Sequence, residues 1–96
     1  MFCRVRKVEN KNNSIRYNFY ICYRYREKWG LGELVSRDIF ILSIRPSKEE
    51  ININFDDLEK IVADKLSKNN YLEYEEVNLK DITEKLINKI NTTTFL

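Results

Sequence analysis

Six side chains near the N-terminus, five arginines and one tyrosine, are spaced so that together they could bind a partner. They fall on alternate positions of two segments: Arg4, Arg6, Arg16, Tyr20, Arg24 and Arg26. A guanidinium group pairs bidentately with phosphates and guanine edges and stacks on bases, which an ammonium does poorly. The pattern therefore indicates a surface that binds a polyanion. The competing interpretation is that these arginines keep exposed strands soluble and pair with acidic helices.

Groups for catalysis are scarce in this chain. It has no His, which is the commonest general base, the usual partner of a Ser or Cys nucleophile and the commonest transition-metal ligand. Two Cys without His cannot form an ordinary zinc site. Gly30 and Gly32 are the only glycines, and no Lys-Ser or Lys-Thr pair follows them as in a phosphate-binding loop. We expect a protein that is not an enzyme, with no cofactor and no bound metal.

Adjacent carboxylates are the other candidate chemistry. They occur in three pairs: Glu49 and Glu50, Asp56 and Asp57, and Glu75 and Glu76. Each pair lies beside helical or linker sequence rather than among apolar residues that would raise a pKa. A position at a helix cap or on a solvated helix face explains these three pairs. The alternative that the pairs leave open is the metal site of a Mg²⁺-dependent nuclease.

The arginines fall within a predicted β-hairpin. From residue 15 to 26 apolar or aromatic residues alternate with mostly polar ones, which predicts a strand. Residues 2–9 can pair back across a turn at residues 11–13, because Asn tolerates the left-handed backbone of short loops. With Cys3 opposite Ile21, the arginines share one face. Cys3 and Cys22 then point to opposite faces and cannot form a disulfide.

A third strand is predicted over residues 34–45, after a loop at 27–33. Its facing is open: Phe40, Leu42 and Ile44 compete with Val35, Ile39 and Ile41 for the core. We favour the first set inward, because Arg37, Ser43 and Arg45 share the other parity, and this adds Arg37 to the candidate nucleic-acid-binding residues. Trp29, in the loop, either tucks under the helices or is exposed as an anchor for a protein partner.

Beyond Pro46 the spacing of apolar residues becomes helical. Asn54 and Asn78 are the predicted N-caps of helices over residues 55–67 and 79–90. Residues 71–76 could be a short strand or a linker, and residues 91–96 form a tail. Since a three-stranded meander cannot bury its apolar face alone, the helices should pack on one face of it. The predicted fold is α+β, in the order β-β-β-α-α.

Length and charge limit the classes of protein further. The 96 residues favour a single domain, in which residues 1–46 carry a net charge of +6 and residues 47–96 carry −4. Neither a membrane span nor a signal peptide is evident, so we expect a cytoplasmic protein. Many Asn, Ile and Lys residues beside a single Ala suggest AT-rich codons and an origin in a low-GC bacterium or one of its mobile elements.

The segment from Phe2 to Gly32 resembles a known family. The matching stretches are residues 4–12 (RVRKVENKN), 17–20 (YNFY) and 23–26 (YRYR). They are similar to the N-terminal β-rich region of DDE-type insertion-sequence transposases. Here residues 27–34 replace the basic segment that follows the second strand in that family, and the catalytic domain with its three acidic residues is missing. The resemblance implies a DNA-associated module detached from its enzyme.

Two functions of different classes follow. The first is a non-enzymatic binding protein whose arginine-bearing sheet contacts nucleic acid or a nucleic-acid-binding complex. The alternative is a phage or plasmid inhibitor of a host defence complex, such as an anti-CRISPR protein, whose acidic half occupies a basic channel by protein–protein contact. A second copy of the chain, forming a homodimer, is a further partner that the sequence leaves open.

Overall fold

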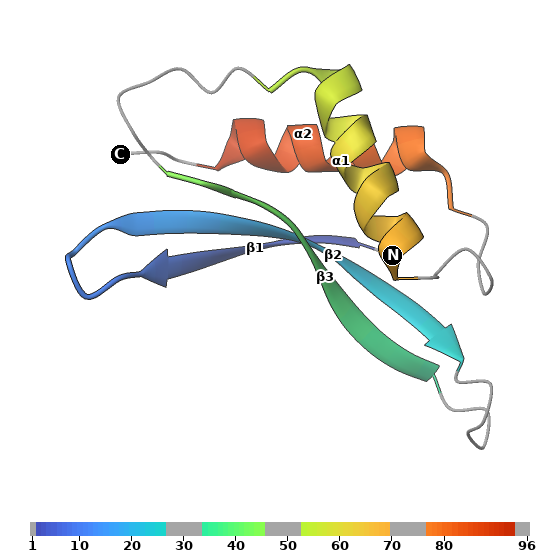
Figure 1. The fold of residues 1–96 in the computed structure, drawn as a ribbon, viewed down its shortest axis with the longest axis horizontal. Helices are drawn as coiled ribbons and strands as arrows, with labels where there is room; N and C mark the ends of the chain where they lie inside the picture. The colour runs from blue at the N-terminus through green and yellow to red at the C-terminus, as the bar shows by residue number, and fades with distance from the viewer. Residues whose placement is uncertain (1, 27–33, 46–52, 70–76, 94–96) are drawn as a thin grey trace.

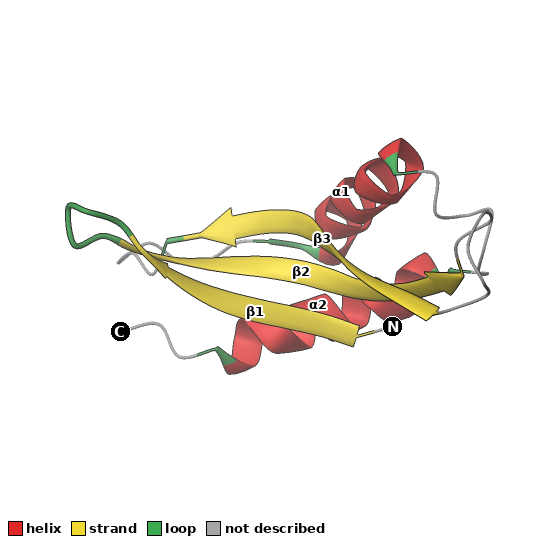
Figure 2. Cartoon of the chain, turned by 90° about the horizontal axis from the view of Figure 1, so that it is seen from below, coloured by secondary structure: helices red, strands yellow, loops and turns green. Residues whose placement is uncertain are grey.

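The computed structural model describes residues 2–26, 34–45, 53–69 and 77–93. Three antiparallel strands, β1 (Phe2–Glu9), β2 (Ile15–Arg26) and β3 (Leu34–Ile44), form one sheet in the order β1-β2-β3. Two helices, α1 (Phe55–Lys68) and α2 (Leu79–Thr92), pack on one face of it (Figure 1). The predicted α+β order is confirmed. Seen from below, the sheet lies in front of the helices (Figure 2), so its second face has no described element over it.

The turn between β1 and β2 forms because of its asparagines. Asn13 adopts a positive φ of 62°, as expected for the residue that reverses the chain. The Asn10 amide donates to the Ser14 carbonyl at 2.9 Å, and the Asn12 side-chain oxygen accepts from the Ser14 hydroxyl at 2.8 Å. This turn sets the register that the alternation predicted, with Cys3 opposite Ile21.

The side chains of β3 do not all face the side of the sheet that was predicted. Tyr20 pairs with Phe40 but the preceding Phe19 pairs with Leu42, so Ile41 is an extra residue in a β-bulge. A bulge reverses the alternation, and both competing apolar sets therefore supply core residues. Ile39, Ile41 and Ile44 are buried. The expectation that Phe40 points inward is wrong, because it lies on the side of the bulge where even-numbered residues face away from the helices.

The helices begin where their caps were predicted. The side-chain oxygens of Asn54 and Asn78 accept hydrogen bonds from the backbone of Asp57 and Asp81, at 2.8 and 3.1 Å. Both helices run further than expected, α1 by one residue and α2 by two into the predicted tail. The Thr92 hydroxyl donates to the Asn88 carbonyl, one of the last carbonyls of α2. No helix in the described part of the chain is long and apolar enough to cross a membrane.

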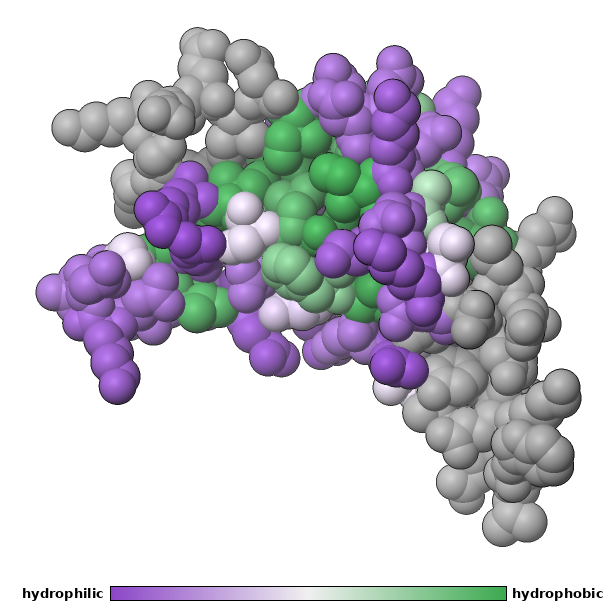
Figure 3. All heavy atoms as spheres, viewed as in Figure 1, coloured by the Kyte–Doolittle hydropathy of each residue, from purple (hydrophilic) through white to green (hydrophobic). Residues whose placement is uncertain are grey.

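The core lies between the sheet and the helices. Apolar residues form a band there, with hydrophilic residues over the helices and at the hairpin end (Figure 3). The strands contribute residues of the helix-facing parity and the helices contribute one stripe each, with these residues fully or almost fully buried: Phe19, Ile21, Tyr23, Leu58, Val62, Leu66, Ile82 and Leu86. The other face of the sheet is thereby left to polar and aromatic side chains.

Candidate nucleic-acid interface

The solvent-facing side of the sheet carries the predicted arginines. Cross-strand neighbours share a face, so the register brings together the residues that we name the arginine face: Phe2, Arg4, Arg6, Arg16, Tyr20, Arg24 and Phe40. Arg4, Arg6 and Arg24 are exposed and Arg16 is half-buried. Asp38 is the one carboxylate at the described positions of this face. The arrangement is a basic surface interrupted by aromatic rings.

Arg4 is the member of the face that an acid partly neutralises. Its guanidinium lies 3.0 Å from the Asp38 carboxylate on β3 and 5.5 Å from the centroid of the Phe2 ring. Both groups of the ion pair are partly exposed, so the pair contributes little to stability. Among the described residues, no ion pair joins an arginine of this face to a helix, as the competing interpretation required.

Arg6 begins a row of cations and rings that crosses the sheet. Its guanidinium carbon lies 5.8 Å from the centroid of the Tyr20 ring. The Tyr20 and Phe40 rings meet edge to face, with centroids 5.8 Å apart. On the far side, the Lys65 ammonium of α1 lies 5.5 Å from the centroid of the Phe40 ring. Aromatic rings and cations therefore lie side by side in this row. A nucleotide needs both, because its base stacks on a ring and its phosphate pairs with a cation.

Three of the predicted site residues are not among the residues of the arginine face. Arg26 is at the end of β2 on the parity of the arginine face, opposite Leu34. Arg37 is opposite Tyr23, a core residue, and therefore lies on the helix-covered side and not on the arginine face. Trp29 is in the loop at 27–33, outside the described residues. Of the predicted nucleic-acid-binding set, the sheet brings together Arg4, Arg6, Arg16, Tyr20 and Arg24.

Sequence reasoning missed the two phenylalanines of this surface. Phe40 is 41% exposed and Phe2 is 44% exposed. The alternation of residues 2–9 could have placed Phe2 with Arg4 and Arg6, since all three share a parity. Phe40 gave no such signal, because the bulge at Ile41 decides its facing.

The charge of the helices also differs from the expectation. α1 contains four acids and three lysines, and α2 contains two acids and three lysines. The two helices are therefore neutral together. The net charge of −4 in the C-terminal half comes from Lys48, Glu49, Glu50, Glu73, Glu75 and Glu76, which lie outside the described residues.

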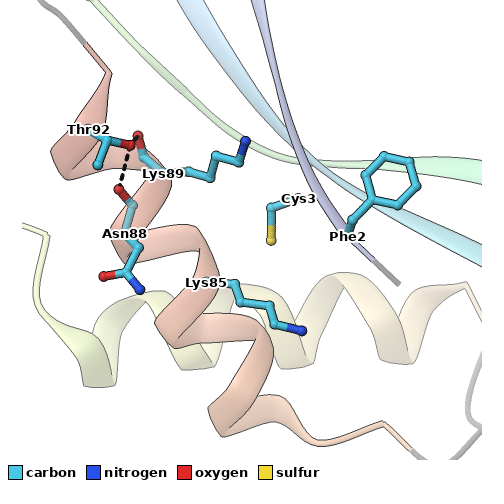
Figure 4. Close-up of a pocket in the computed structure, with 6 residues that line it drawn as sticks. All are labelled: Phe2, Cys3, Lys85, Asn88, Lys89 and Thr92. Atoms are coloured by element: carbon cyan, nitrogen blue, oxygen red, sulfur yellow. Dashed lines mark hydrogen bonds between the residues drawn. The ribbon is translucent and has the colours of Figure 1, made fainter.

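A hollow of about 470 Å³ lies apart from this face, between the start of β1 and the C-terminal half of α2. Its lining residues are Phe2, Cys3, Lys85, Asn88, Lys89 and Thr92. The Cys3 sulfur points toward α2, whereas the Phe2 ring points away from that helix (Figure 4). Lys85 is 3.1 Å from Asp81, which offsets its charge. This hollow has cations and a thiol but no general base among its lining residues.

No family model, curated protein or solved structure matches the chain. The arginine face must therefore be interpreted from its own contacts. Among the described residues, no group of three or more Cys, Asp or Glu side chains is placed to hold a metal ion.

Both thiols have environments that favour the protonated form. Burial raises the pKa of Cys3 above 9.0, against a smaller opposing effect of Lys85 and Lys89. Burial also raises the pKa of Cys22, and a hydrogen bond to Asp38 adds to the effect. Both cysteines are free and lie on opposite faces of the sheet, as predicted. Thiolate is the reactive species, so neither is activated at neutral pH.

We therefore predict slow alkylation of both thiols in the folded chain. At pH 7.5 iodoacetamide should modify each at least about ten times more slowly than in the urea-unfolded chain, because burial limits both access and ionisation. As pH rises above about 9, the unfolded thiols ionise first, and the free energy of unfolding should fall. Single-thiol variants Cys3→Ser and Cys22→Ser, followed by mass spectrometry, assign each rate. Prompt labelling of either thiol at neutral pH contradicts the prediction.

Proposed function

We propose that this protein is a non-catalytic binding protein that contacts nucleic acid through the arginine face. The observation that carries the proposal is the composition of one solvent-facing sheet surface, where four described arginines and three aromatic rings meet a single carboxylate. Arginine is suited to phosphate because its planar fork forms two parallel hydrogen bonds. The register and the turn hold these groups on a rigid scaffold, which lowers the entropy that binding must overcome.

The alternative, an inhibitor of a host defence complex, depended on acidic helices that occupy a basic channel. The described helices are neutral together, so that surface has no excess of negative charge. No described contact favours the alternative over binding of nucleic acid.

Salt dependence of binding tests the proposal. In fluorescence anisotropy with labelled oligonucleotides, the logarithm of the association constant should fall linearly with the logarithm of salt concentration. Each phosphate contact adds about 0.9 to the slope for duplex DNA and about 0.7 for single strands. Four arginines give an expected slope of about −3 to −4. Absence of binding at 50 mM salt and 10 μM protein, or an affinity that does not depend on salt, would contradict the proposal.

A further inference from the structure

The arginine face has more aromatic surface than phosphate binding needs. Tyr20 and Phe40 form an edge-to-face pair at its centre, and Phe2 lies one row away, beside Arg4. Phosphate contacts require only cations and hydrogen-bond donors. The Phe40 ring is 41% exposed on the solvent-facing side of the sheet, and the Lys65 ammonium lies against it. Such a ring is suited to a ligand with flat apolar faces.

The spacing of the rings fits separate bases. Phe2 pairs with Cys22, and Arg4 pairs with Tyr20, so the rows of Phe2 and Tyr20 lie two residues apart along the strands. Phe2 and Tyr20 are therefore diagonal neighbours on adjacent strands, a relation in which the two positions lie about 7–8 Å apart. Neighbouring nucleotides of an extended chain can reach rings at such a spacing, with their phosphates between them on the arginine side chains.

Base faces are accessible in a single strand and not in a duplex. In a duplex each base is stacked on its neighbours, so rings on the surface of a sheet would meet mainly sugars and phosphates. At Tyr20 and Phe40 the surface is three strands wide, whereas the major groove admits a helix or a two-stranded ribbon. The rings therefore favour a single strand over a duplex groove.

We propose that the arginine face binds single-stranded nucleic acid, with bases stacked on Phe40, Tyr20 and Phe2 and phosphates on Arg6, Arg16 and Arg24. This inference rests on the proposed function. The Arg6–Tyr20 and Lys65–Phe40 contacts place a cation on each ring of the central pair, and a base can join or replace these stacks. Stacking does not depend on base identity, so sequence preference should be weak.

The test compares a 15-nucleotide thymidine strand, a uridine strand and a 15-base-pair duplex by fluorescence anisotropy at one salt concentration. Both single strands should bind more tightly than the duplex. Phe40→Ala should weaken single-strand binding by roughly 5- to 100-fold, the range found for loss of one base–ring stack, and leave duplex binding nearly unchanged. Phe40→Trp should retain the single-strand affinity, because the larger ring also stacks.

Ile61→Ala is the control, because it removes an exposed apolar side chain of α1 that is not part of the arginine face and lies one turn from Lys65. It should alter neither affinity. Circular dichroism checks that each variant is folded. Salt-dependent binding with an equal or higher duplex affinity, or an unchanged single-strand affinity in folded Phe40→Ala, overturns the inference alone. Absence of binding to all three ligands at low salt overturns the proposed function as well.

Discussion

Replacing Arg6, Arg16 and Arg24 with alanine is expected to lower the affinity for nucleic acid by about 100- to 1000-fold at 0.1 M salt. Each phosphate contact releases nearly one counterion from the nucleic acid. Loss of one contact should therefore lower the association constant roughly five- to tenfold at this salt concentration. The salt slope should also become shallower by about 2 to 3. Thermal stability should change little, because Arg6 and Arg24 are exposed and Arg16 is only half-buried. Substitutions of exposed residues usually cost less than about 0.5 kcal/mol each.

A matched triple variant separates a local effect from an effect of net charge. Lys60, Lys68 and Lys80 are exposed on the helices, and replacing them with alanine removes the same three positive charges. Lys68 pairs with Asp64, but an exposed pair one turn apart contributes little. We expect this control to keep most of its affinity. Equal losses in the two triple variants would show that the arginine face has no special role.

The hairpin was predictable because several local signals agreed. The alternation in residues 15–26 fixes two faces, and the asparagines between the strands allow one short turn, so little choice of register remains. The same agreement holds for α1, where Asn54 precedes two acids and an apolar stripe. The set of arginines on one face followed from the register with no further information.

Strand β3 was harder to predict because its apolar residues occur at both parities. A regular strand can bury only one set, and the strand resolves the conflict with a bulge that depends on packing against β2 and α1. Arg37 and Phe40, on one side of this bulge, were consequently assigned to the wrong faces. The Arg4–Asp38 ion pair was equally hidden, because it joins residues far apart in the sequence. Contacts of this kind depend on strand pairing rather than on local pattern.

Replacing Phe19 with alanine is expected to destabilise the fold by about 3–5 kcal/mol, the usual cost of deleting a fully buried phenyl ring. Phe19 is 0% exposed and lies between Val5 and Leu42 in the centre of the sheet. A small domain has about 5–15 kcal/mol of stability in total, so the variant should be near its folding limit at 37 °C. Urea unfolding followed by circular dichroism measures the loss.

The adjacent ring of β3 supplies the control, since Phe40→Ala deletes the same atoms from the opposite face. Phe40 is 41% exposed and packs edge to face on Tyr20, so its loss should cost about 0.5–1.5 kcal/mol. The difference between the two variants measures how much more a ring on the helix-facing side of the sheet contributes than a ring on the solvent-facing side. Comparable losses would place Phe40 in the core and remove the aromatic surface on which single-strand binding depends.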